Sequence, residues 1–190
     1  MVDSLTHSDL DYLDEALKLA EQKTSAKISI VVRPASGAYR EYILVYSLVF
    51  GSAVTILLWD FAIVRNFLWL LSIQLGIVAL CDIAHSIGNI FVPFVPRKVR
   101  HHFGAQAAMR EYHELHAQQP HDAPFVLLFV SLAERYVHVV TNPVVHKRLP
   151  GNWNKITESF THSVRHHSLR AACAEAAGHI AEILAIHFPA

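Results

Sequence analysis

The feature that most constrains this chain is a long apolar stretch at its centre, residues 42–91. Its first part, residues 42–59, holds no charged side chain, and its second part, residues 67–91, carries Asp82 and His85 near its end. About 20 apolar residues in a helix cross the hydrocarbon core of a bilayer. We therefore expect two transmembrane helices that form a hairpin, and an integral membrane protein with two spans.

Composition supports this division and argues against nucleic-acid binding. The chain is 53% hydrophobic and 17% charged, whereas a soluble domain carries about 25% charged residues. The deficit is concentrated in the central stretch. Lys plus Arg and Asp plus Glu both number 16, so no basic field indicates a nucleic-acid partner. Cys81 and Cys173 lie far apart and form neither a disulfide framework nor a zinc motif.

Basic residues on both sides of the apolar stretch predict its orientation. They are Lys23, Lys27, Arg33 and Arg40 before the stretch and Arg97, Lys98 and Arg100 after it. The connection between the two spans holds only Asp60 and Arg65 as charged residues. The positive-inside rule then places both flanks and both termini in the cytoplasm. Residues 1–14 lack a signal-peptide pattern, so we expect the hairpin itself to direct insertion. The second basic cluster would face anionic lipid headgroups.

The two flanks together show the pattern of one small α/β domain. The predicted elements are a helix to about residue 23, a strand over 28–32, a helix over 97–119, strands over 125–130 and 135–140, and helices over 153–166 and 169–188. The inner face of the helix over 97–119 is predicted at Val99, Phe103, Ala107 and Leu115. The first flank is too short to bury a core alone, so its strand is expected to join the sheet of the second flank.

Three phrases in the flanks resemble one known family. They are AEQKTSAKISIVV at residues 20–32, LLFVSLAERYVHVV at 127–140, and AAGHIAEILAIHFP at 176–189, with Trp153 in a helix between the last two. This pattern resembles the TPM domain family, and in particular bacterial inner-membrane members that carry a hairpin between the two halves of the domain. The resemblance implies residues 1–41 and 93–190 as the two parts of a TPM-like α/β domain with a small mixed sheet, interrupted by a transmembrane hairpin at 42–92.

The family also implies where a functional pocket would lie. Its members include phosphatases, cation-binding proteins and assembly factors. The corresponding candidate pocket here contains Asp122, Ser131, Glu134 and Asn142. Where relatives carry an Asp-x-Gly-Ile phrase, this chain has Asn142 followed by Pro-Val-Val. An amide is a poorer ligand for a hard cation than a carboxylate, so the departure favours a non-catalytic member.

Other polar residues are candidate sites with simpler alternatives. Two histidine pairs, His113 with His116 and His162 with His166, share helical faces at metal-ligand spacing. Neither pair has a third ligand at a suitable offset, which favours solvated helix surface.

Asp82 and His85 form an ionisable pair in the second span. Such a pair is a functional candidate, and interfacial snorkelling or packing is the alternative.

The sequence therefore predicts a membrane-anchored, TPM-like accessory or interaction factor that is not an enzyme. Its expected partners are the lipid bilayer and either another protein or a second copy of the chain. One alternative is a phosphatase-like hydrolase or a divalent-cation-binding protein, and a divalent cation is the only cofactor considered. A further alternative is a component of a small oligomeric channel or transporter, in which Asp82 would lie on the path of the ion.

Overall fold

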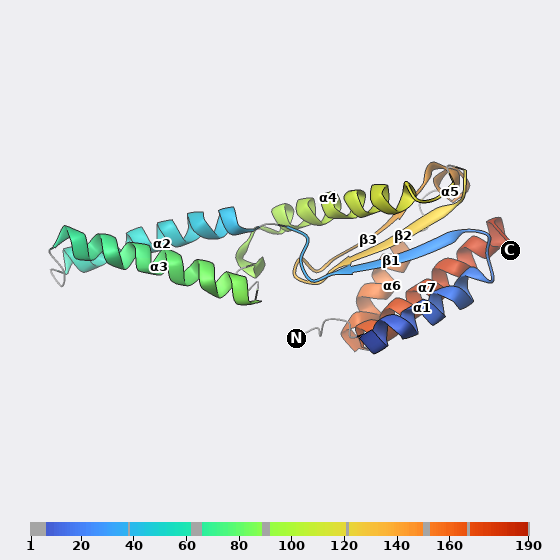
Figure 1. Ribbon diagram of the computed structural model, residues 1–190, viewed down its shortest axis with the longest axis horizontal. Helices are drawn as coiled ribbons and strands as arrows, with labels where there is room; N and C mark the ends of the chain where they lie inside the picture. Colours follow the sequence, from blue (N-terminus) through green and yellow to red (C-terminus); the bar gives the residue numbers. More distant parts are fainter. Residues whose placement is uncertain are drawn as a thin grey trace. The chain divides into compact units, whose positions relative to one another are not determined.

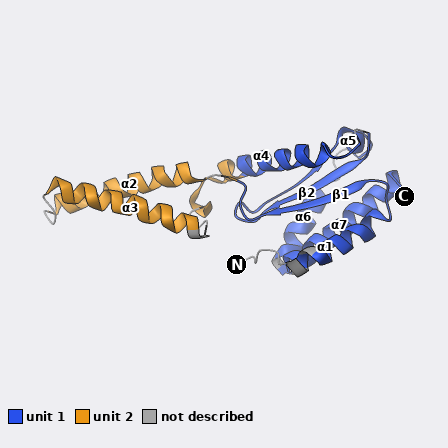
Figure 2. Cartoon of the chain, in the orientation of Figure 1, with its two compact units in different colours: residues 1–36, 101–190 blue, residues 37–100 orange. Residues whose placement is uncertain are grey.

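The computed structural model describes residues 7–37, 39–61, 66–88, 92–120, 122–149, 153–166 and 168–189. The chain divides into two compact units, residues 1–36 with 101–190 and residues 37–100 (Figure 2). The segments on both sides of the hairpin thus belong to one unit. The second unit, residues 37–100, extends beyond the hairpin predicted at residues 42–92 on both sides. Helix α2 already begins at Arg40, and the first turn of α4 belongs to the same unit as the hairpin.

The α/β unit has a three-stranded sheet and helices on both of its faces (Figure 1). In chain order its elements are α1 His7–Glu21, β1 Lys27–Arg33, α4 Arg97–His116, β2 Phe125–Ser131, β3 Tyr136–Thr141, α5 Pro143–Arg148, α6 Trp153–His166 and α7 Leu169–His187. The predicted elements are present, with boundaries that shift by one to three residues. The mixed α/β fold class is confirmed.

The sheet joins the two flanks of the chain directly. Its strand order is β1-β2-β3, with β1 parallel to β2 and β2 antiparallel to β3. Lys27 pairs with Phe125 in the first ladder, and Val126 pairs with Thr141 in the second. The prediction that the first strand joins the second flank is therefore confirmed. Parallel strands need a long connection between them, and here it contains both the hairpin and α4.

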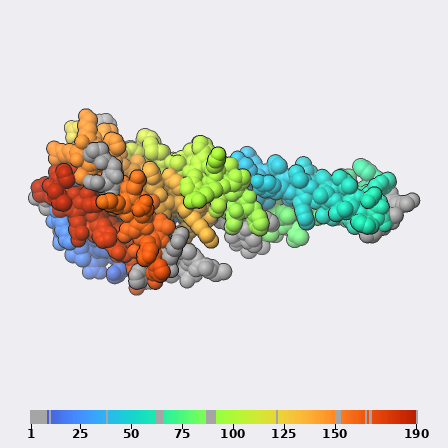
Figure 3. Space-filling model, turned by 180° about the vertical axis from the view of Figure 1, so that it is seen from behind, coloured from blue at the N-terminus to red at the C-terminus, as the bar shows by residue number. Residues whose placement is uncertain are grey.

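The central strand β2 is buried on both faces and divides two cores. Val126, Leu128 and Val130 point into the larger core, which α1, α5, α6 and α7 cover. The alternate residues Phe125, Leu127 and Phe129 pack against α4 in a smaller core. This explains the continuous apolar run, since a strand covered on both faces has no polar side. Figure 3 shows the outer surface of α6 and α7, coloured orange to red.

The buried face of helix α4 differs from the predicted one, and it includes two small residues. Gly104, Ala108 and Tyr112, spaced by four, are its buried residues. A Cβ atom at Gly104 would lie 2.6 Å from Cδ1 of Tyr136, so this close approach requires glycine. The predicted inner positions Val99, Phe103, Ala107 and Leu115 are only half-buried. Ala107 and Leu115 pack against the smaller core as predicted, whereas the most buried positions of α4 lie one residue further along, at Gly104, Ala108 and Tyr112.

A short helix after β3 was not predicted. Helix α5 begins directly after Asn142, whose side-chain Oδ1 accepts a hydrogen bond from the Val145 N–H at 3.1 Å, and Pro143 occupies the first turn. Asn before Pro is a strong helix-start signal. The sequence prediction used the same two residues only as the end of the strand. In the sequence, Asn152 and Ser168 directly precede the last two predicted helices and are candidate caps. Ser168 caps α7 by accepting from the Ala171 N–H, and Asn152 lies outside the described residues.

The second unit contains two long apolar helices, α2 Arg40–Asp60 and α3 Phe67–Gly88, followed by a single turn of 3₁₀ helix, η1 Val92–Phe94. Both helices are long and apolar enough to cross a membrane. Their large apolar side chains point outward, whereas Ser47 and Gly51 of α2 are buried. Ser52 and Gln74 form a hydrogen bond of 3.1 Å between the helices. The hairpin thus buries small and polar residues together with Ile43, and exposes most of its large apolar side chains.

Candidate functional site

Ser131 and Glu134 of the candidate pocket form a buried clasp at the β2–β3 turn. The Ser131 hydroxyl donates to Glu134 Oε2, and the Ser36 N–H donates to Glu134 Oε1 at 2.9 Å. Both side chains are buried. Backbone hydrogen bonds from the turn to Arg33 and Pro34 run alongside. The carboxylate therefore holds the turn against the segment that leaves β1, and both of its oxygens accept hydrogen bonds.

Asn142 is a fully engaged structural residue at the opposite end of the sheet. Its Oδ1 accepts from the N–H groups of Phe125 and Val145, and its Nδ2 donates to the Ala123 carbonyl at 2.8 Å. Its backbone N–H also donates to the Phe125 carbonyl. Asn142 is completely buried, whereas Asp122 is exposed on the adjacent turn. Asn142 thus fixes the start of β2 to the start of α5.

The four candidate pocket residues do not meet at one place. Asp122 and Asn142 lie at the start of β2, and Ser131 and Glu134 lie at its end. A strand of this length separates its two ends by about 20 Å, at roughly 3.3 Å for each residue. The family resemblance predicted one pocket from these four residues, and the extended strand β2 keeps the two pairs apart.

The three sequence motifs that resemble the TPM family contain residues whose hydrogen bonds connect separate segments of the α/β unit. Thr24 is buried, and its Oγ1 donates to the Phe188 carbonyl at 2.6 Å and accepts from the Ala26 N–H. Glu21 accepts from the Ile28 N–H at 3.3 Å and pairs with Lys27. The first phrase is therefore tied to the last one, close to the C-terminus, and the middle phrase contains the clasp at Glu134.

The histidine pairs lie on helix surfaces without a set of metal ligands. His162 and His166 are exposed, with ring centroids 4.5 Å apart. His116 stacks on Tyr112 and Phe125, and His113 meets the edge of Tyr112. Among the described residues, no three His, Cys, Asp or Glu side chains come close enough together to hold a metal ion. Stacking on aromatic rings accounts for the positions of His113 and His116.

Aromatic and histidine rings also gather on the α4 face of the sheet. Tyr136 lies 5.4 Å from His101 in an edge-on arrangement and 6.0 Å from His138. Burial raises the pKa of Tyr136 and lowers the pKa of His138, because a partly desolvated ring disfavours its charged form. Both side chains are therefore neutral near pH 7.

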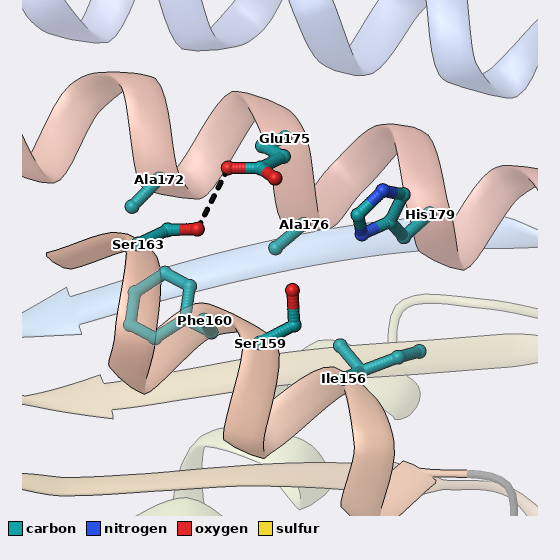
Figure 4. Close-up of a pocket in the computed structure, with 8 residues that line it drawn as sticks. All are labelled: Ile156, Ser159, Phe160, Ser163, Ala172, Glu175, Ala176 and His179. Carbon is teal, nitrogen blue, oxygen red and sulfur yellow. Dashed lines mark hydrogen bonds between the residues drawn. The ribbon is translucent and has the colours of Figure 1, made fainter. Parts of the chain in front are cut away.

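Between α6 and α7 lies a shallow polar seam (Figure 4). The Ser163 hydroxyl donates to Glu175 Oε2 at 2.8 Å, and Ser159 and His179 lie further along the same seam. The seam is too narrow to admit a ligand, because Phe160 and Ile156 fill its base. We interpret it as a helix–helix contact.

In the hairpin unit, Asp82 pairs with a residue that the sequence arguments did not consider. The Arg40 guanidinium donates to both carboxylate oxygens of Asp82, each at 3.0 Å. His85, one turn further along α3, has a buried Nδ1 atom without a hydrogen-bond partner. The Arg40–Asp82 pair joins the first turn of α2 to α3. The signal for it was present in the sequence, since Arg40 directly precedes the first span.

The basic residues after the hairpin begin α4. Arg97 and Lys98 are exposed, and Arg100 is half-buried. The Nε atom of Arg100 is buried and has no hydrogen-bond partner. Three cations thus stand within seven residues of Phe94, the last residue of η1.

Comparison with known proteins supports the fold. No family model matches the chain, and no curated protein matches it. The NMR structure of the BA42 protein from the psychrophilic bacterium Bizionia argentinensis matches with a TM-score of 0.58 and 11% sequence identity. The match covers 98% of this chain and 86% of that protein. At this identity the likeness concerns the fold alone. Membership of the TPM family stays a prediction.

Proposed function

We propose that this chain holds a small TPM-like α/β domain at the cytoplasmic surface of a bilayer, as a non-enzymatic accessory or interaction factor. The observation that carries the proposal is the hairpin of α2 and α3, which exposes most of its large apolar side chains. Its two candidate spans, of 21 and 20 residues with a mean hydropathy of 2.0, expose Leu, Phe and Trp side chains. Side chains of this kind are stable on a helix surface when the surroundings are hydrocarbon.

The hydrogen bonding of the candidate pocket supports a role without catalysis. A nucleophile or general base needs an accessible polar atom within reach of a substrate. Ser131 and Glu134 are buried and bonded to each other, and Asn142 is buried with its amide engaged at both ends. These groups stabilise turns, and the exposed Asp122 lies near Asn142 but at the opposite end of β2 from Ser131 and Glu134.

Two matched substitutions test the anchoring. Leu75 in α3 and Leu19 in α1 have similar exposed fractions, 61% and 56%. A lysine at the centre of a span costs about 3 kcal/mol on insertion scales, whereas a lysine on a water-facing helix costs little. Leu75→Lys should therefore reduce the carbonate-resistant, vesicle-floating fraction of the full chain, and Leu19→Lys should not. Equal behaviour of the two variants would contradict the anchoring.

Orientation and activity are tested separately. In a Cys81→Ala background, Asp60→Cys should react with an impermeant maleimide only from outside, and Lys155→Cys only from the cytoplasmic side. Hydrolysis of p-nitrophenyl phosphate should stay at background, and Ca²⁺ or Mg²⁺ should not shift the melting temperature. Hydrolysis that Asp122→Ala abolishes would replace this proposal with the phosphatase alternative.

A further inference from the structure

The hairpin unit contains an open apolar groove next to the end where the chain enters and leaves it. Ile43, Tyr46, Ser47, Phe50, Cys81 and Phe94 line it, and its volume is about 450 Å³. Ile43 and Ser47 are buried and form the floor, whereas Tyr46, Phe50 and Phe94 are exposed and form the walls. The stretch from Ile43 to Phe50 extends about 10 Å along the axis of α2, at a helical rise of about 1.5 Å for each residue.

The position of the groove along the hairpin is set by charged neighbours. Cys81 is adjacent to Asp82, which pairs with Arg40 three residues before Ile43. This ion pair indicates the end of the hairpin that reaches the headgroup region, since charged pairs avoid the hydrocarbon centre. The groove therefore starts near the level of the headgroups and continues toward the interior of the bilayer.

Positive charge lies in the same unit, directly after the residue that closes the groove. Phe94 is followed within six positions by Arg97, Lys98 and Arg100. Arg97 and Lys98 are exposed and Arg100 is half-buried, and a phosphate oxygen is a strong acceptor for ammonium and guanidinium groups. An apolar groove and a cationic cluster together match the two ends of one kind of molecule, an anionic phospholipid.

We propose that the hairpin binds one anionic phospholipid from the bilayer, with an acyl chain in the groove and the phosphate headgroup at Arg97, Lys98 and Arg100. The Arg40–Asp82 pair neutralises the neighbouring carboxylate, so the local charge at the headgroup stays positive. The groove lining is mostly apolar, and the hydroxyl of Ser47 donates to the Leu44 carbonyl, so the lining suits an alkyl chain. This inference rests on the proposed anchoring and adds a defined lipid ligand to it.

The test uses the full chain in phosphatidylcholine vesicles that contain a small fraction of spin-labelled lipid. Motionally restricted lipid is counted with labelled phosphatidylglycerol and, separately, with labelled phosphatidylcholine. We expect phosphatidylglycerol to associate at least about threefold more strongly, since basic residues near the surface each attract anionic lipid. The variant Lys98→Gln/Arg100→Gln should remove this preference. Lys155→Gln, on exposed α6, is the charge control and should preserve it.

The groove itself is tested by size and by labelling. Ser47→Leu fills the floor and should lower the restricted fraction of phosphatidylglycerol, whereas Leu75→Phe on the outer face of α3 should not. In the unmodified chain, a phosphatidylglycerol with a photoreactive acyl chain should label peptides that contain residues 43–50, 81 or 94. This measurement does not depend on any variant folding.

The outcomes separate the two proposals. A chain that floats with vesicles but binds both lipids equally overturns the lipid site and leaves the anchoring intact. Photolabelling spread evenly over α2 and α3 also overturns the site. A chain that does not float with vesicles overturns both.

Discussion

Helices α7 and α3 are both apolar, yet they bury their side chains in opposite ways. Eight residues of α7 are buried, including Leu184, and small residues such as Ala176 and Ala181 allow close packing. In the candidate span of α3, none of the side chains is buried, and Trp69 and Leu80 are among its most exposed. Apolar composition alone therefore does not say where a helix resides. The distribution of large and small residues around its axis does.

The two units also place their polar residues differently. In the α/β unit the exposed surface carries ion pairs such as Lys27–Glu21 and Arg170–Asp9. In the hairpin, Ser52 and Gln74 bond between the helices, where small and polar residues are the usual contact in membranes. One unit buries its large apolar side chains, and the other exposes most of them. Five predictions follow from the packing of the two units, in order of decreasing effect.

The largest difference is expected between two leucines. Leu184 is 0% exposed and Leu80 is 68% exposed. Leu184→Ala should lower the free energy of unfolding of the α/β unit by about 2–5 kcal/mol, because it leaves a cavity in a packed core. Leu80→Ala should change it by less than about 0.5 kcal/mol, as expected away from a core. Urea unfolding in detergent, followed by Trp153 fluorescence, measures both. Equal effects would mean that α3 is buried in the α/β unit.

The close approach of α4 to the sheet predicts the next effect. A methyl group at Gly104 would overlap Tyr136, whereas one at Gly178 in α7 would meet nothing within 4 Å. Gly104→Ala should cost about 1–3 kcal/mol through overpacking. Gly178→Ala should stabilise by about 0.5–1 kcal/mol, because alanine favours a helix. The same unfolding assay applies. Stabilisation by both would show that α4 is loosely packed.

The third prediction compares two helix caps that differ in burial. Asn142 is buried with three side-chain hydrogen bonds, and Ser168 caps α7 with one exposed bond. Asn142→Ala should cost about 2 kcal/mol and Ser168→Ala about 0.5 kcal/mol, the two ends of the usual range for caps. Asn142→Asp tests the family site: it replaces a donor to the Ala123 carbonyl with an acceptor and should destabilise with or without Ca²⁺. Rescue of Asn142→Asp by Ca²⁺ would show a latent cation site.

A smaller effect depends on pH. Burial raises the pKa of Cys173 to about 12, from an ordinary value of 9.0. Above pH 9 the unfolded thiol loses its proton while the folded one keeps it, so stability falls as pH rises from 9 toward 12. Between pH 8 and pH 10 the loss should be about 1 kcal/mol, and Cys173→Ala should remove it. An unchanged pH slope in that variant would assign the loss to other groups.

The smallest effect concerns the ion pair of the hairpin. Arg40 is 70% exposed and Asp82 is 28% exposed. In detergent, a double-mutant cycle of Arg40→Gln and Asp82→Asn should give a coupling of about 0.5 kcal/mol, as for exposed pairs. The melting temperature of the hairpin helices, by far-ultraviolet circular dichroism, provides the measurement. Zero coupling would mean that each residue pairs elsewhere.

The sequence predicted most of the fold because the apolar patterns of its elements are strong. The uninterrupted run at Phe125–Ser131 predicts a strand covered on both faces, and the structure has it so. The most buried positions of α4 were missed, although the predicted Ala107 and Leu115 pack against the core. Glycine gives no hydropathy signal, yet Gly104 approaches the sheet closely. Helix α5 was missed because six residues are too few for a periodic pattern, so only its cap could reveal it.

Sites were harder to predict than elements. The candidate pocket requires four side chains to lie close together, those of Asp122, Ser131, Glu134 and Asn142. The extended strand β2 separates two of them from the other two, and the sequence does not give the distance between the ends of that strand directly. The partner of Asp82 was missed for a different reason. The sequence pattern indicated a partner on the same helix or in a second copy of the chain, whereas Arg40 lies 42 positions earlier in the same chain.

The parallel pairing of β1 with β2 has a consequence for the order of synthesis. Residue Lys27 leaves the ribosome about 100 positions before its partner Phe125, and such distant pairings form late. Both apolar helices emerge in that interval. Strand β1 therefore lacks its neighbour in the sheet until the rest of the α/β unit has been synthesised. The contact of α2 with α3 within that interval shortens the effective loop between β1 and β2, which lowers the entropy cost of bringing the two strands together.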